Sequence, residues 1–165
     1  MSRPCLNTSQ DTLLAEVLEA TMALEVARKP ESNWSKRQSN YSQARSQIMN
    51  VVALKELQDA SRALLRATLL NNQAFFEEDI AAQTPSDQRY EQVVGILKKA
   101  LEAEAQGGLA EGSYEVHRNL AVIQKRRGKP DAADHFAAAQ RAAVGRTEEH
   151  IRKDLEELIK YIEQK

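Results

Sequence analysis

Among the side chains of this chain that could do acid–base or metal chemistry are three histidines. His117, His135 and His150 are far apart in the sequence, and no two of them form a close pair such as the H-x3-H spacing of many zinc sites. We therefore expect them to be surface or helix-packing residues. No metal and no cofactor is predicted.

Nucleophilic catalysis is not expected either. The single cysteine, Cys5, has no partner for an internal disulfide, and it lies in an N-terminal segment, residues 1–8, that we expect to be flexible. The sequence also lacks a G-x-S-x-G elbow, a Walker loop and a dinucleotide-binding glycine fingerprint. The chain is therefore predicted not to be an enzyme.

A basic run, Lys125-Arg126-Arg127-Gly128-Lys129, could contact phosphate or act as a short nuclear signal. The favoured interpretation is simpler, because cations at the C-terminus of a helix complement its dipole. The whole chain has 23 basic and 24 acidic residues and a formal net charge of -1. That balance gives no general attraction to nucleic acid or to an anionic membrane, so neither partner is expected.

Trp34 stands out because it lies in a polar stretch, Glu-Ser-Asn-Trp-Ser-Lys, between two expected helices. Such a residue can plug the end of a helical bundle. It can also anchor a partner protein, as aromatic side chains often do. Both interpretations stay open from the sequence.

The composition predicts an all-α fold. The chain has 165 residues, enough for one domain over residues 9–165, and it is rich in the good helix formers Ala, Leu, Glu, Gln, Lys and Arg. No apolar run approaches the roughly 18 residues that span a bilayer, and no apolar signal core follows the N-terminus. Because a lone cysteine also fits a reducing compartment, we expect a soluble, cytoplasmic protein.

Turn signals divide the chain into helices. Pro30 ends a first helix, Thr84 is expected to cap a helix whose first residue is Pro85, and Gly107-Gly108 ends that helix. Asn71-Asn72 is the expected break in a long helical stretch, because Asn disfavours helix interiors. The helical ranges predicted in this way are about 8–29, 35–83 with that break, 85–106, 111–127, 130–143 and 147–164.

A small-x3-large-x2-small pattern recurs in three of these ranges. The copies are Ala60…Leu64…Ala67, Val93…Leu97…Ala100 and Ala133…Ala137…Gln140. The first two are offset by about one helical hairpin, the size of a 34-residue repeat. The chain here resembles the tetratricopeptide-repeat family, best over Tyr114–Gln140, where Leu120-Ala121, Gly128 and Ala133 match the family's pattern. The resemblance covers roughly residues 73–141, or 37–141 with a weaker first copy.

The chain departs from the family at several positions. His117, Gln124 and Gln140 replace the usual aromatic and small residues. Around residues 50–56 no Gly or Pro marks a turn, so residues 35–71 form either one long helix or a hairpin. The resemblance implies an array of antiparallel helical hairpins with two to three repeats. The alternative fold is an irregular helical bundle.

In tetratricopeptide repeats the first helix of each hairpin lines a groove that binds a peptide or helix. Carried over by position, the groove residues here are Arg118, Asn119, Val122, Lys125 and Arg126. Residues 147–164 carry an aliphatic stripe that we expect to cap the array on residues 130–143. The predicted function is that of a scaffold or adaptor that binds another protein. The alternative is a structural subunit of a larger multiprotein assembly.

Overall fold

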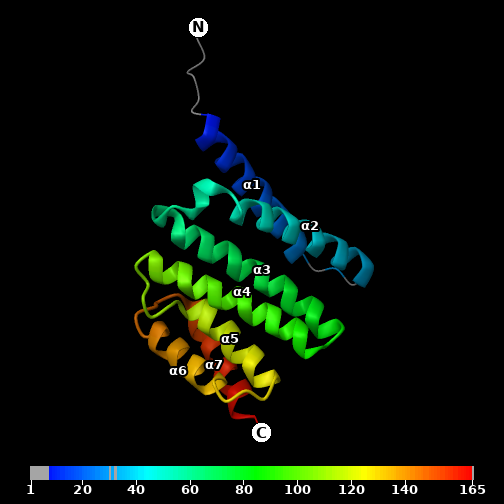
Figure 1. The fold of residues 1–165 in the computed structure, drawn as a ribbon. Coiled ribbons are helices and arrows are strands. Elements are labelled where there is room, and N and C mark those ends of the chain that lie inside the picture. Colours follow the sequence, from blue (N-terminus) through cyan, green and yellow to red (C-terminus); the bar gives the residue numbers. More distant parts are fainter. Residues whose placement is uncertain (1–7, 30, 32, 165) are drawn as a thin grey trace.

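The computed structural model describes residues 8–29, 31 and 33–164. Within those residues every regular element is a helix, so the all-α prediction is confirmed (Figure 1). The helices are α1 (Thr8–Arg28), α2 (Trp34–Val52), α3 (Ala63–Gln83), α4 (Asp87–Gln106), α5 (Tyr114–Arg126), α6 (Ala132–Ala143) and α7 (Glu149–Glu163), with short 3-10 turns at Lys55–Gln58 and Ala60–Arg62. Cys5, most of the segment 1–8 and Pro30 lie outside the described residues.

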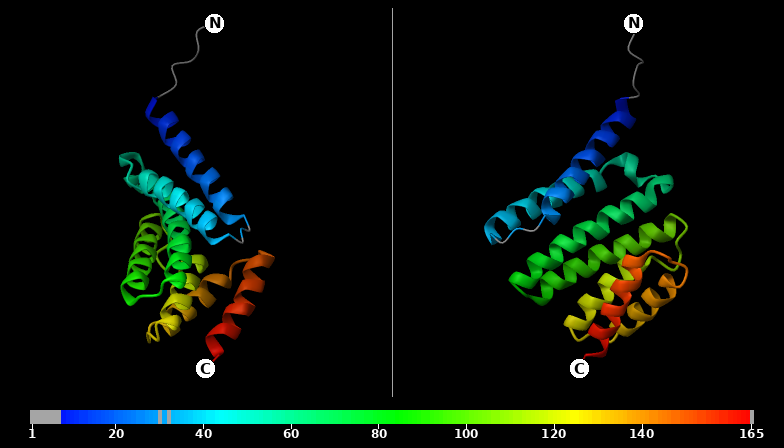
Figure 2. Two further views of the ribbon diagram at one scale, coloured as in Figure 1. Left: turned by 90° about the vertical axis from the view of Figure 1, so that its right-hand side faces the viewer. Right: turned by 180° about the vertical axis from the view of Figure 1, so that it is seen from behind.

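Six of the helices pack as consecutive pairs. α1 packs on α2, α3 on α4, and α5 on α6, and the pairs stack through α2 against α3 and α4 against α5. Figure 2 shows the stack from two further sides. The last helix, α7, has no such mate and lies against both α5 and α6.

Side-chain caps and glycines set the turns around α4 to α6. The hydroxyl of Ser86 accepts a hydrogen bond from the Arg89 amide at 3.2 Å, and that of Ser113 accepts one from the Val116 amide at 3.3 Å. These bonds satisfy amides that the first helical turn leaves unpaired. Gly128 follows α5 with a φ of 65°, a left-handed conformation that favours glycine.

Two expectations about helix ends are wrong. Ser86, rather than Thr84, caps α4, because Ser86 is still extended with φ -151° and ψ 148°. The helix therefore begins at Asp87, not at Pro85. Thr84 instead closes α3, where its amide donates to the Ile80 carbonyl.

The predicted break at Asn71-Asn72 is also wrong, because α3 runs through both residues. The Asn71 side chain accepts a hydrogen bond from Asn119 at 2.9 Å, so it bonds to another helix rather than competing for its own backbone. The real break falls at residues 53–62. Residues 35–71 thus form parts of two helices.

Side-chain contacts hold that break in place of glycine or proline. Leu57 is fully buried in the core beside α1, α2 and α3. The Arg66 guanidinium donates to the Leu57 carbonyl, and the Gln58 amide donates to the Val52 carbonyl at 2.6 Å. Buried carbonyls of an irregular segment need such donors, so the turn depends on the rest of the fold.

The core is divided along the stack into three clusters. The first joins α1, α2 and α3 around Ile48 and Phe76, the second joins α3, α4 and α5 around Leu97 and Leu120, and the third joins α5, α6 and α7 around Leu158. Each cluster fills the space between neighbouring helices, so the stack has no single centre. Among the described helices, none combines the length and apolar character that crossing a bilayer requires.

Candidate functional site

A groove runs along one face of α3 and is walled by α5 and the start of α7. It consists of two adjoining cavities of about 450 and 420 Å³, which share Asn71, Asn72 and Glu115. We call this the α3 groove. Its other lining residues are Leu64, Ala67, Thr68, Phe75, Glu104, Leu109, Ser113, Tyr114, Val116, Arg118, Asn119, Arg146, His150, Ile151 and Asp154.

The floor of the α3 groove has apolar ends and a polar middle. Leu64 at one end is 45% exposed and Phe75 at the other is 49% exposed, although both are large apolar side chains. Between them Asn71 accepts the hydrogen bond from Asn119 across the groove. With a rise of 1.5 Å per residue, Leu64 and Phe75 are about 16 Å apart along the helix.

A hydrogen-bonded cluster around Asp154 fixes α7 as the wall of the groove. The Tyr114 hydroxyl donates to one carboxylate oxygen of Asp154 at 2.6 Å. Arg118 donates to the same carboxylate through Nε at 3.1 Å and Nη2 at 3.2 Å. Burial, and then the bond to Asp154, raise the pKa of Tyr114, so the hydroxyl remains protonated and keeps donating.

A second charged cluster borders the other cavity. Arg146, in the connection between α6 and α7, donates to Glu115 at 2.9 and 3.3 Å and to Glu148 at 2.9 and 3.0 Å. Because Arg146 contacts two carboxylates, it ties the start of α5 to the start of α7. The α6–α7 connection is thereby held over the groove.

The five groove residues predicted on α5 divide into two groups. Arg118 and Asn119 line the α3 groove. Val122 is buried in the cluster under α7, and Lys125 donates to the carbonyls of Ile162 at 2.7 Å and Gln164 at 2.6 Å. These carbonyls lie at the C-terminal end of α7, so Lys125 caps that helix. Arg126 forms an ion pair with Glu78 of α3 at 2.7 Å.

Three of the four cations of the basic run contact other helices of the described chain. Besides Lys125 and Arg126, Arg127 donates at 3.1 Å to Asp87 and also bonds Glu91, both on α4. The run therefore joins α5 to α3, α4 and α7.

Trp34 lies away from these contacts, at the first residue of α2. The side chain is half-buried, and the Arg37 guanidinium stacks over its ring at 4.8 Å from the centroid. Trp34 lines neither cavity of the α3 groove. Whether it plugs the fold or anchors a partner stays a prediction.

Two of the histidines meet between α5 and α6. The Nδ1 atoms of His117 and His135 are 3.2 Å apart, and Nε2 of His117 is 2.7 Å from the Glu111 carbonyl. A carbonyl only accepts, so Nε2 of His117 carries a proton, and when both rings are neutral Nδ1 of His135 donates to Nδ1 of His117. Burial, and then the neighbouring His117, lower the pKa of His135. No group of three or more metal-ligating side chains forms in the described ranges.

Sequence reasoning missed the floor of the groove. Leu64, Asn71 and Phe75 lie on α3, which is apolar around most of its circumference, so periodicity does not show which apolar residues remain exposed. The small-x3-large-x2-small pattern placed Leu64 among core positions. Comparison with models of known protein families, with curated proteins and with solved structures finds no match to this chain.

Proposed function

We propose that this chain is an interaction module that binds a peptide or helix of another protein in the α3 groove. The observation that carries the proposal is the half-exposed Phe75, which lies in a groove beside the amides of Asn71 and Asn119. A large aromatic side chain at the edge of a pocket is a frequent anchor in protein interfaces. Side-chain amides both donate and accept, so they match the N–H and C=O of a peptide backbone.

The size of the groove suits a short segment. About 16 Å separates its apolar ends along α3, which corresponds to roughly five residues of extended chain or three turns of helix. Apolar side chains of the segment would contact Leu64 and Phe75. Its backbone or polar side chains would bond to the asparagines between them.

The proposal extends the resemblance to tetratricopeptide repeats. In that family the first helix of each hairpin faces the groove, and α3 and α5 are the first helices of their pairs. This chain would differ in one respect, because α7 covers part of α5. The binding surface proposed here is therefore centred on α3, with Arg118 and Asn119 at its edge.

Site-specific photocrosslinking in cells tests the proposal. A photoreactive residue replaces Phe75 in one variant and Gln92, an exposed residue of α4 outside both cavities, in the control. We expect a defined adduct from position 75 that is absent from position 92. In the purified pair, Phe75→Ala should weaken binding at least tenfold, as for an interface anchor. The same adducts from both positions would contradict the proposal.

A second function, that of a subunit within a larger assembly, is favoured by the outer face of α1. Leu18 is 58% exposed and Met22 is 62% exposed on that helix. An assembly interface there would give the photocrosslinked adduct from position 22 instead of position 75. That outcome would move the interface from the groove to α1.

A further inference from the structure

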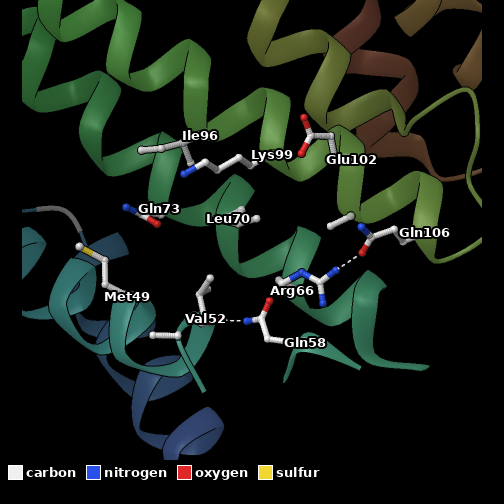
Figure 3. A pocket seen from close by; sticks show the side chains of 12 residues that line it. Met49, Val52, Gln58, Arg66, Leu70, Gln73, Ile96, Lys99, Glu102 and Gln106 are labelled. Carbon is white, nitrogen blue, oxygen red and sulfur yellow. Dashed lines mark hydrogen bonds between the residues drawn. The ribbon is translucent and has the colours of Figure 1, made fainter. Parts of the chain in front are cut away.

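A cavity of about 530 Å³ lies between the end of α2, the turns that follow it, and α3 and α4 (Figure 3). It shares no lining residue with the α3 groove. Its apolar surface comes from Met49, Val52, Ala53, Leu70, Ile96 and Ala103, and its polar surface from Gln58, Arg66, Gln73, Lys99, Glu102 and Gln106. We call it the α2–α4 cavity.

Gln73 is the most informative side chain of this cavity. Only 8% of its surface is exposed, and within the described part of the chain its amide makes no hydrogen bond. The amide is not sealed off from solvent, since it opens into the cavity. The Gln73 amide faces the cavity, where a bound molecule could supply the missing partner.

The charges around the cavity favour an anion. Lys99 has no ion pair with any residue that the structure describes, and in Figure 3 its ammonium points toward Gln73 and Ile96 rather than toward Glu102. Arg66 donates to the Leu57 carbonyl and to the Gln106 side chain, so no carboxylate neutralises its charge. Two cations thus accompany the one carboxylate of Glu102.

We propose that the α2–α4 cavity binds a small amphipathic carboxylate. Its apolar chain would lie against Leu70 and Val52, and its carboxylate would accept hydrogen bonds from Lys99 and from the Gln73 amide. Charge-assisted hydrogen bonds of this kind are stronger than neutral ones. A volume of 530 Å³ lies within the ordinary range of small-molecule pockets.

The proposed site is tested by isothermal titration calorimetry of the full chain with decanoate. The decanoate is kept below its critical micelle concentration. Decanol has the same apolar chain without the charge, and acetate has the charge without the chain. We expect saturable one-to-one binding of decanoate, binding of decanol that is about tenfold weaker, and none of acetate. Equal affinity for decanoate and decanol would overturn the proposal, because the cations would then contribute nothing.

Two lysines that follow each other on α4 provide a matched control. Lys99→Gln should weaken decanoate binding about tenfold, whereas Lys98→Gln removes the same charge from an exposed residue outside the cavity and should leave it unchanged. Gln73→Leu should also weaken binding, because the carboxylate loses one hydrogen-bond donor. Equal losses from both lysine variants, or no binding by the unaltered chain, would exclude this site.

Discussion

The two terminal helices, α1 and α7, end the same stack in opposite ways (Figure 1). α7 has one apolar face, which is buried through Ile151 and Leu158, and a charged face in solvent. α1 is apolar on two sides: Leu24 is buried against α2, while Leu18 and Met22 are exposed. One end of the stack is closed by an amphipathic helix, and the other presents an apolar surface.

Polar contacts also distinguish α7 from α1. α7 is joined to α5 by the Asp154 cluster, by the Lys125 cap at its C-terminus and by Arg146 at its start. Among the helices of the described chain, α1 packs mainly on α2, and that contact is made by apolar side chains. A terminal helix thus closes a stack when its sequence separates apolar and charged faces, because the charged face can then meet water.

The largest expected effect lies at the closed end. Leu158→Ala removes a side chain that is 2% exposed in the α5–α6–α7 cluster. We expect the free energy of unfolding to fall by about 2–4 kcal/mol, because the site loses apolar burial and keeps a cavity. Urea denaturation measures the change, and Glu157→Ala on the exposed face is the control. A loss below about 0.5 kcal/mol would mean that α7 does not close the stack.

The Asp154 cluster should contribute less. Asp154→Ala leaves the Tyr114 hydroxyl and the Arg118 guanidinium without their acceptor. Because the Arg118 and Asp154 side chains are about one third exposed, water replaces part of what is lost. We expect a fall of about 1–2 kcal/mol in the free energy of unfolding. Hydrogen exchange at the Leu155 and Leu158 amides should become faster, and unchanged exchange would show that the apolar stripe holds α7 alone.

Lowering the pH should destabilise the fold through His135, whose side chain lies between α5 and α6. In the folded chain its pKa lies below the ordinary 6.5, since burial and His117 oppose the charge more than Asp131 and Asp134 favour it; Lys98 of α4 adds to the opposition. The unfolded chain therefore takes up the proton first, and the free energy of unfolding falls as the pH drops below about 6.5 toward the folded pKa. His135→Gln should flatten that slope in denaturation measured across the window.

The titration of the Glu78 carboxyl group changes the free energy of unfolding in the opposite sense. Burial raises the pKa of Glu78 above its ordinary 4.5, so its contribution to stability falls as the pH rises from about 4.5 through its folded pKa. Glu78 is the same in the His135→Gln variant and in the unaltered chain. The difference between their two slopes therefore isolates the histidine, and identical slopes would contradict its role.

The turn between α5 and α6 was predicted correctly from local signals, whereas the helix start at Pro85 and the break at Asn71-Asn72 were wrong although they also used local signals. Gly128 and the turn residues around it placed the α5–α6 turn, because a left-handed conformation is a local property. No glycine or proline marks the break at residues 53–62; besides a local cap, in which the Asp59 carboxylate accepts from the Ser61 amide at 3.2 Å, it depends on buried Leu57 and on Arg66. The resemblance to tetratricopeptide repeats likewise implied an open groove face on α5. It did not show that α7 would cover part of that face, which is why Val122 and Lys125 contact α7.

The smallest expected effect on stability lies at the open end. Leu18 and Met22 are four positions apart in the sequence, so they lie on one face of α1, and both are more than half exposed. Leu18→Gln and Met22→Gln replace apolar surface that folding does not bury. We expect each substitution to change the free energy of unfolding by less than about 0.5 kcal/mol, in contrast to Leu158→Ala.

The same two substitutions also test whether the exposed face of α1 promotes self-association. Apolar surface in contact with water favours association, so the double variant should be less prone to self-association at high concentration than the unaltered chain. Analytical ultracentrifugation measures this, with Gln92→Ala on α4 as a control that leaves α1 intact. A loss of stability comparable to that of Leu158→Ala would show that the outer face of α1 is covered in solution. The two ends of the stack would then be alike.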